Sequence, residues 1–139
     1  MTASTKRMTA RQYRTLADFR YELRRFMRYS EEITRRHGMT PLQYQMLLQI
    51  RGYPGKSRVT VGELAERLQA KHHGVVALVT RCQRAGLVAR SVSDRDRRAV
   101  LVRLTPRGER ALERLARLHR DQLLAIQSRL LIPSADLLA

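Results

Sequence analysis

The sequence predicts a mainly α-helical fold with one small β-hairpin. Apolar residues recur at three- and four-residue spacing along most of the chain, which is the period of an amphipathic helix. Residues 87–93 and 99–104 depart from this period as two short segments rich in Val and Leu around a charged pentad, a pattern typical of a hairpin. Thr-Pro pairs at 40–41 and 105–106 mark helix starts, because Thr favours the N-cap and Pro the first helical position.

The N-terminal part is expected to form a basic arm and one long helix. Residues 1–10 are polar and basic without a clear period, so we expect a flexible arm. Residues 11–38 show the helical period and are expected to form a helix that ends at His37 and Gly38. The stripe on one face of this helix consists of Leu16, Phe19, Leu23, Phe26, Ser30 and Ile33.

Two shorter helices are expected next. The first begins at the Thr40–Pro41 pair and is closed by Gly52. The second opens at Thr60, whose hydroxyl accepts an amide hydrogen bond while Glu63, three residues on, reaches back in a capping box. After a break around residues 69–71, the chain returns to the helical period.

A fourth helix is expected over roughly residues 72–85. It stops at Gly86, because only glycine enters the left-handed conformation without a steric penalty. Two such helices joined by a tight turn form a helix-turn-helix, whose second helix lies in the DNA major groove. The hairpin that follows has arginines at its tip, residues 94–98, which suit the narrow, electronegative minor groove. Residues 40–104 are therefore predicted to form a winged helix-turn-helix DNA-binding domain.

The last long helix is expected over about residues 106–131, with Pro133 after its end and a short helix capped by Ser134 over residues 135–139. Its apolar stripe consists of Leu112, Leu115, His119, Leu123, Ile126 and Leu130. A helix longer than the core of the domain requires suggests a partner helix. We therefore expect residues 105–139, together with the N-terminal helix, to form a helical dimerisation region.

Composition narrows the classes of function. The formal net charge of +16 and the sequence pI near 11.5 predict attraction to a polyanion, either nucleic acid or an anionic membrane surface. Residues 71–107 concentrate this charge, with nine basic residues against two acidic ones. No apolar run approaches the roughly 18 residues of a membrane span, and no apolar leader follows the N-terminal charges. A soluble cytoplasmic protein is expected.

Nothing in the sequence predicts an enzyme, a cofactor or a metal site. There are no paired carboxylates in an apolar setting, no nucleophile near a base, and no metal-ligand spacing. Gly55, Lys56 and Ser57 are similar to the end of a phosphate-binding loop, but Ile50 occupies the position of its upstream glycine. The single cysteine excludes an intramolecular disulfide.

The run SDRDRRAVLVRLTPRG, preceded by HHGVVALVTRCQRAGLVAR, resembles the MarR family of bacterial transcriptional regulators. The match includes the Asp-x-Arg of the family, at Asp96 and Arg98, and its Leu-Thr-x-x-Gly, at Leu104, Thr105 and Gly108. The resemblance covers about residues 16–131.

This resemblance implies a two-fold homodimer in which the first and last helices of two chains interleave. Relatives often continue beyond the position of Leu138, so this end of the dimer element is expected to be short. Small aromatic or phenolic effectors bind in this family between the dimer helices and the DNA-binding lobe. The same region here is bordered by the first, second and last helices, where Tyr44 and His37 are the candidate effector-binding residues.

The residues predicted to contact DNA bases lie on the fourth helix, opposite its buried face. They are His72, His73, Val76, Ala77, Thr80 and Arg81. His73 and Arg81 are the main candidates for base edges, since a guanidinium bonds guanine O6 and N7 together. Contacts with phosphates are expected from Lys71, Arg84 and Arg90.

In the wing, Arg98 is expected to enter the minor groove, with Arg95 and Arg97 beside it. Asp96 is expected to hold an arginine in its bound rotamer through a bidentate ion pair. The alternative reading of this turn is a solvated charged loop.

Three other features have competing interpretations. Adjacent His72 and His73 point in different directions on a helix, which argues against a metal site. His119 lies on an apolar stripe, where a core or interface residue is more common than a sensor. Cys82 lies on the buried face of the fourth helix, which favours a small core residue over a redox switch.

The sequence therefore predicts a homodimeric, sequence-specific DNA-binding regulator of transcription. We expect a repressor that a small molecule releases, acting on an inverted repeat with half-sites about 10 bp apart. The alternative is a sequence-indifferent architectural DNA-binding protein, which the high positive charge motivates. Binding of the basic first helix to an anionic membrane is a further alternative.

Overall fold

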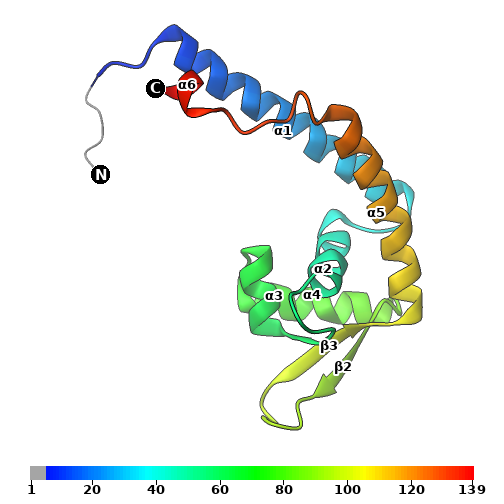
Figure 1. The fold of residues 1–139 in the computed structure, drawn as a ribbon. Helices are drawn as coiled ribbons and strands as arrows, with labels where there is room; N and C mark the ends of the chain where they lie inside the picture. The colour runs from blue at the N-terminus through cyan, green and yellow to red at the C-terminus, as the bar shows by residue number, and fades with distance from the viewer. Residues whose placement is uncertain (1–5) are drawn as a thin grey trace.

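The computed structural model describes residues 6–139, so the first half of the predicted arm lies outside the described residues. Its elements are α1 (Ala10–Arg36), α2 (Pro41–Arg51), β1 (Val59–Thr60), α3 (Val61–Leu68), α4 (His72–Arg84), β2 (Val88–Val92), β3 (Val100–Leu104), α5 (Pro106–Ile126) and α6 (Ala135–Leu138). The predicted fold class is confirmed: helices dominate, and the strands form one small sheet. Figure 1 shows a lobe of α2, α3, α4 and the sheet, from which α1 and α5 extend to one side.

Helices begin where the sequence places N-cap threonines. Thr9, Thr40 and Thr60 each form a complete capping box with the residue three positions later. The box at Thr9 starts α1 at Ala10, so the last residue of the predicted arm belongs to the helix. These starts are thus marked by hydrogen bonds between residues that are neighbours in the sequence.

The wing contains one strand more than predicted. β2 and β3 form the expected antiparallel hairpin, and β1 pairs with the other edge of β3. Val102 in the middle strand lies opposite both Val59 and Arg90. The two residues of β1 are too few to show a period-2 pattern, so no sequence signal marks this strand.

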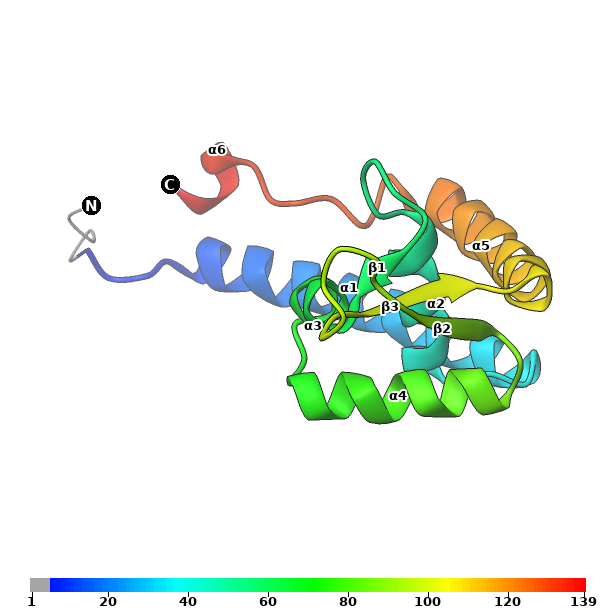
Figure 2. The same cartoon turned by 90° about the horizontal axis from the view of Figure 1, so that it is seen from below.

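Aliphatic side chains of α2 form the centre of the core. Met46, Leu47 and Ile50 are at most 1% exposed, and α2 packs against α1, α3, α4, α5 and β3. Leu64 of α3 and Val79 of α4 complete the centre. Figure 2 shows α4 beside the sheet, which places this helix on the surface of the lobe while its inner face remains buried.

The predicted end of the last long helix, near residue 131, is wrong. α5 ends at Ile126, whose carbonyl accepts from the amides of both Arg129 and Leu130 in a closing turn. Leu123 of the predicted stripe is 44% exposed and Ile132 is 87% exposed, so this chain offers no core for them. Without packing on an apolar face, a helix end is marginal.

The short C-terminal helix is present as α6, over Ala135–Leu138. Ser134 occupies its N-cap position, but the side chain makes no capping hydrogen bond, which corrects the predicted role of this serine. α6 lies along the beginning of α1, where the Gln12 side-chain amide donates to the Leu138 carbonyl over 2.9 Å. No helix among residues 6–139 combines the length and apolarity needed to cross a bilayer.

The ends of the wing meet at a tight junction between α4 and α5. Gly86 has a φ of +75°, and the following Leu87 places its carbonyl beside Gly108 in the first turn of α5. A Cβ on Gly108 would lie 2.0 Å from the Leu87 oxygen. Position 108 therefore requires glycine for close approach of two backbones rather than for a left-handed conformation.

We predict that Gly108→Ala lowers the free energy of unfolding by about 1–3 kcal/mol, because the added methyl overpacks the junction. Urea denaturation of the two proteins measures this difference. Gly74→Ala in α4 is the matched control, since its Cβ would meet nothing within 4 Å. That control is expected to raise stability by up to about 1 kcal/mol through helix propensity. If Gly108→Ala had the same free energy of unfolding as wild type, this result would contradict the close approach of the Leu87 carbonyl to Gly108.

Candidate nucleic-acid interface

The turn between α3 and α4 ends α3 with a left-handed residue. Gln69 has a φ of 50°, and its side-chain amide donates to the Glu66 carbonyl over 2.8 Å and to the Glu66 carboxylate over 3.1 Å. These bonds support a conformation that is uncommon for residues other than glycine. The break predicted at residues 69–71 is confirmed, and α4 follows at His72.

The exposed face of α4 carries the residues predicted to contact bases. His72, His73, Val76, Ala77 and Arg81 are all exposed, opposite the buried Val75, Leu78, Val79 and Cys82. Lys71 and Arg84, predicted to contact phosphates, are exposed at the two ends of the helix. Their positions satisfy the geometry of a groove-reading helix, and contact with DNA stays a prediction.

Thr80 and Arg90 are joined to one another within the chain. The Arg90 guanidinium donates through Nη2 to the Thr80 hydroxyl over 2.7 Å and to the Val76 carbonyl over 3.2 Å. Thr80 is only partly exposed, unlike the other five residues that are predicted to contact bases. This bridge fixes the side chain of Arg90 in β2 against the middle of α4.

The wing tip is a turn ordered by Ser93 and Asp96. The Ser93 hydroxyl accepts from the amides of Arg95 and Asp96 over 3.3 and 3.4 Å, and one Asp96 carboxylate oxygen accepts from the Arg98 amide over 3.0 Å. Arg95, Arg97 and Arg98 are exposed. None of these arginines forms an ion pair with another residue of the described chain.

The expected bidentate ion pair of Asp96 is not formed. Its carboxylate binds the backbone of the turn instead, because an Asp side chain readily accepts from an amide two residues on. Asp96 therefore shapes the loop that presents the arginines.

A second candidate site lies between α2 and α5. A cavity of about 470 Å³ is bordered by Tyr44 and Leu48 from α2 and by His119, Leu123 and further residues of α5. The rings of Tyr44 and His119 stack with centroids 4.3 Å apart and planes 12° apart. Burial raises the pKa of Tyr44.

His119 joins three helices from inside the core. Its Nδ1 lies 2.7 Å from the Leu115 carbonyl oxygen, which only accepts, so Nδ1 carries a proton. Its Nε2 lies 2.7 Å from the Ser30 hydroxyl of α1. Sequence reasoning identified a core or interface residue here, and His119 is only 6% exposed. Its place in the lining of the cavity was missed, although it shares a helical stripe with the lining residue Leu123.

His37, the other predicted effector residue, does not line this cavity. Its ring is exposed after the end of α1, and Nδ1 lies 2.9 Å from the Ile33 carbonyl oxygen. The His37 ring therefore interacts with a backbone carbonyl in the last turn of α1. A role of His37 in effector binding stays a prediction.

Cys82 is a core residue, as expected. Its side chain is fully buried, and burial raises the pKa of the thiol to about 11. The thiolate required for oxidation is thus scarce at neutral pH. Within residues 6–139, no cluster of three or more His, Cys, Asp and Glu side chains has the arrangement of a metal site.

The cap of α3 contains the most strongly shifted carboxylate of the lobe. Burial alone would raise the pKa of Glu63, but hydrogen bonds from Lys56 and from the Thr60 amide outweigh it and lower the pKa to about 2. The Lys56 ammonium lies 2.7 Å from this carboxylate. The lysine of the Gly55-Lys56-Ser57 run is therefore engaged with a protein side chain.

The fold and the exposed helix define a winged helix-turn-helix protein. A model described as the MarR family matches residues 37–99. The solved structure of a MarR family protein from Bacillus stearothermophilus is 30% identical, with a TM-score of 0.71, and the match covers 88% of this chain and 84% of that one. The chain belongs to the MarR family.

Two further comparisons concern one solved complex with operator DNA and one relative that is named as a transcriptional regulator. A mutant of MarR from E. coli, solved in complex with operator DNA, is 26% identical over 81% of this chain and 77% of that one, with a TM-score of 0.67. An uncharacterised HTH-type transcriptional regulator of Bacillus cereus is 35% identical over 61% of this chain and 54% of its own length. The chain spans about half the length of the curated relatives it matches. These relatives are named as transcriptional regulators and not as enzymes.

The low pKa of Glu63 predicts pH-dependent stability. Its folded-state pKa of about 2 lies below the ordinary value of 4.5, so its contribution is fully present above about pH 4.5 and is lost as the pH falls toward 2. We predict that Glu63→Gln lowers the free energy of unfolding at pH 7 by about 1 kcal/mol, since charged hydrogen bonds are lost. Denaturant unfolding at pH 7, 4 and 3 should show the difference from wild type shrinking with acidity.

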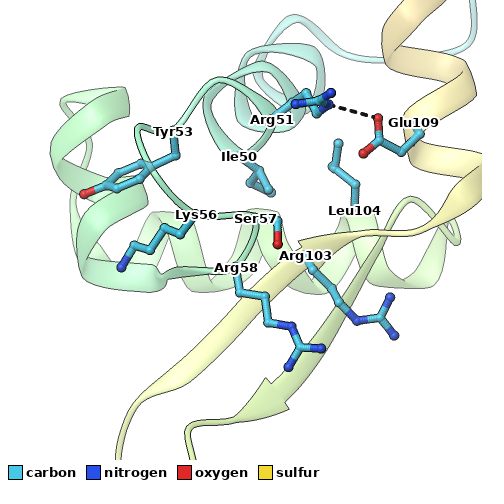
Figure 3. Close-up of a pocket in the computed structure, with 9 residues that line it drawn as sticks. All are labelled: Ile50, Arg51, Tyr53, Lys56, Ser57, Arg58, Arg103, Leu104 and Glu109. Atoms are coloured by element: carbon cyan, nitrogen blue, oxygen red, sulfur yellow. Dashed lines mark ion pairs between the residues drawn. The ribbon is translucent and has the colours of Figure 1, made fainter.

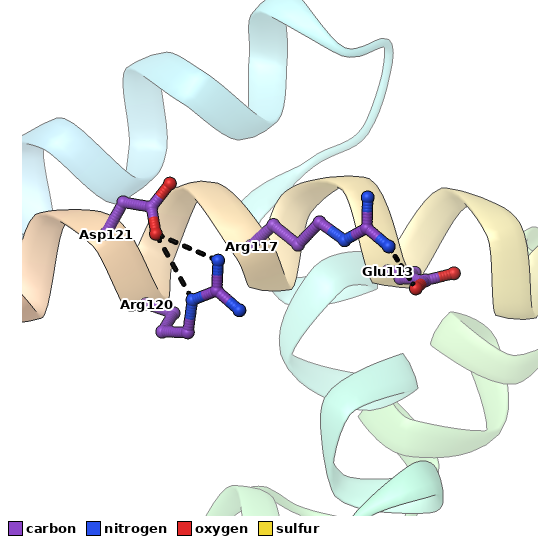
Figure 4. Close-up of polar contacts among 4 residues, drawn as sticks. All are labelled: Glu113, Arg117, Arg120 and Asp121. Carbon is purple, nitrogen blue, oxygen red and sulfur yellow. Dashed lines mark hydrogen bonds and ion pairs between the residues drawn. The ribbon is translucent and has the colours of Figure 1, made fainter.

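Glu113→Gln is the control for this experiment. Glu113 pairs with Arg117 over 2.7 Å on the outer face of α5, beside the Arg120–Asp121 pair (Figure 4), but both side chains are about two-thirds exposed, at 64% and 66%. Such surface pairs contribute less than about 1 kcal/mol. A difference between Glu63→Gln and wild type that stays constant with pH would refute the assignment.

Proposed function

We propose that this chain is a homodimeric, sequence-specific DNA-binding regulator of transcription. The observation that carries the proposal is the pairing of an exposed, cationic α4 with a wing whose arginines have no carboxylate partner in the described chain. Unpaired arginines on adjoining elements attract a polyanion, and α4 has the exposed face that major-groove reading requires.

The residues of α4 and β2 divide into base-reading and positioning roles. His73 and Arg81 are proposed to reach base edges, because both project from the exposed face. Lys71, Arg84 and Arg90 are proposed to contact phosphates and so fix the register on the duplex. The Thr80–Arg90 bridge supports this role for Arg90, since a held guanidinium loses little rotamer freedom on binding.

In the wing, Arg98 is the proposed minor-groove residue, with Arg95 and Arg97 beside it. The hydrogen bond from the Arg98 amide to Asp96 supports this role, because it orders the turn without neutralising the guanidinium. Asp96 thereby contributes to binding through loop shape.

A second copy of the chain is proposed to cover the exposed apolar side chains of α1, of the end of α5 and of the segment that follows α5. Leu16, Tyr21 and Met27 of α1 are 42%, 61% and 49% exposed. Leu124, Leu131 and Ile132 near the C-terminal end are 59%, 60% and 87% exposed. Apolar exposure of this extent marks an interface, and a two-fold dimer would present two α4 helices to an inverted repeat.

The cavity beside Tyr44 and His119 is the proposed effector site. An aromatic molecule would find the Tyr44–His119 stack at one wall and Leu48 and Leu123 nearby. A ligand there would favour one arrangement of α2 against α5 and so one spacing of the two α4 helices. Repression by operator occupancy, relieved by such a ligand, is the mode of action we propose. A regulator of this kind acts on the chromosome in the cytoplasm.

The second candidate function is an architectural DNA-binding protein without sequence preference. The net charge of +16 favours it, because phosphate attraction alone supplies non-specific affinity. The two functions differ in whether one duplex sequence is preferred over others.

Arg98→Ala tests the DNA-binding surface. We predict weaker binding to a fixed duplex. The slope of log K against log salt should be smaller in magnitude by about one, since one cation that releases counterions from the duplex is lost. Arg117→Ala on α5 removes the same charge away from α4 and the wing, and it should leave the slope unchanged. An unaltered slope in a folded Arg98→Ala protein would remove Arg98 from the interface.

A further inference from the structure

A second basic surface lies beside a cavity that the DNA-binding role does not use. The cavity has a volume of about 440 Å³ and lies among the end of α2, the loop before β1, strand β3 and the first turn of α5 (Figure 3). Its volume falls in the range of small-molecule sites, roughly 300–1,000 Å³.

Two arginines of this cavity lie next to the paired ends of β1 and β3: Arg58 directly precedes β1, and Arg103 belongs to β3. Val59 pairs with Val102 in antiparallel register, so a continuation of this register by one residue beyond the start of β1 brings Arg58 across from Arg103. Like charges placed directly opposite in a sheet are destabilising. Both side chains line the cavity, and neither forms an ion pair within residues 6–139. An anion bound between them would remove this repulsion.

The arginine pair faces away from α4. Val59 and Val102 are fully buried, so alternation along β3 directs Arg103 to the opposite face of the sheet, and Arg58 immediately before β1 is expected on that face too. Arg90, which lies opposite Val102, is directed to the α4 side and bonds Thr80 there. A DNA duplex bound to α4 would therefore contact the face of the sheet that carries Arg90, and not the face that carries Arg58 and Arg103.

The remaining lining adds one available cation and an apolar floor. Arg51 pairs with Glu109 over 3.4 Å, but the two side chains are 67% and 51% exposed, and such a pair contributes little. Arg51 can therefore turn to a competing anion at small cost. Leu104 forms the accessible apolar part of the lining, because Ile50 behind it is only 1% exposed.

We propose that this cavity binds a small polyanion, a metabolite with phosphate or carboxylate groups. Arg58 and Arg103 bind the acidic groups in bidentate fashion, which guanidinium forks suit, and the rest of the molecule packs on Leu104. Lys56 is not the principal ligand, because its ammonium is engaged with Glu63. The site differs in this respect from a glycine-cradled phosphate loop.

Inorganic pyrophosphate is the probe, titrated into the full chain by calorimetry at constant ionic strength, with citrate in parallel. Wild type is expected to show saturable binding at one site per chain. Arg58→Gln/Arg103→Gln should weaken that binding at least tenfold, and Arg103→Gln alone should weaken it in the same direction. The proposal is supported if the binding of pyrophosphate or of citrate is weakened by these substitutions. The probe that binds more tightly to wild type identifies phosphate or carboxylate as the preferred acid group.

Arg114→Gln/Arg117→Gln on α5 removes the same two charges outside the cavity and is expected to bind the probes as wild type does. Equal weakening in both double variants would overturn the proposal, because it would indicate diffuse attraction to a basic protein. Absence of saturable binding would also overturn it. If Arg58→Gln/Arg103→Gln instead loses affinity for a DNA duplex, the surface belongs to DNA and the proposal fails. The Arg58→Gln/Arg103→Gln variant is expected to remain folded, because it loses two like charges that lie close together. Circular dichroism checks this expectation.

Discussion

The close approach of Leu87 to the first turn of α5 is the constraint on which the DNA-binding part of the structure depends. The Leu87 carbonyl accepts from the Thr105 amide over 3.1 Å, and the Thr105 hydroxyl donates to the Gly86 carbonyl over 2.6 Å. Gly108, whose amide donates to the same hydroxyl over 3.0 Å, leaves room for this contact. The end of α4, both ends of the wing and the start of α5 are thereby joined. These elements must change orientation together.

This junction links the proposed effector cavity to the DNA-binding surface. His119 lies about three turns along α5 from Gly108 and stacks on Tyr44 of α2, the helix at the centre of the core. Close-packed cores respond to a ligand by shifts of whole elements. A change at the Tyr44–His119 stack is therefore expected to move α5 against α2, and we expect the junction to pass this movement on to α4.

Local signals in the sequence predicted most helix starts and the wing, whereas features that depend on tertiary contacts were missed. The capping box at Thr60 involves only neighbouring residues, so its pattern was sufficient. The strand Val59–Thr60 exists only because β3 pairs with it. The end of α5 at Ile126 depends on where packing stops, which no local signal records. The Asp96 carboxylate accepts from a backbone amide and not from a guanidinium, and a sequence motif does not distinguish between these two donors.

The most direct measurement of the central claim is selection from a pool of random-sequence duplexes at near-physiological salt. Two copies of a rigid α4–wing–α5 unit related by a two-fold axis predict recovery of an inverted repeat with half-sites about 10 bp apart. Uniform binding without any enriched sequence, falling steeply with salt, would contradict a specific dimeric regulator. That result would leave the fold unchanged and favour the architectural function.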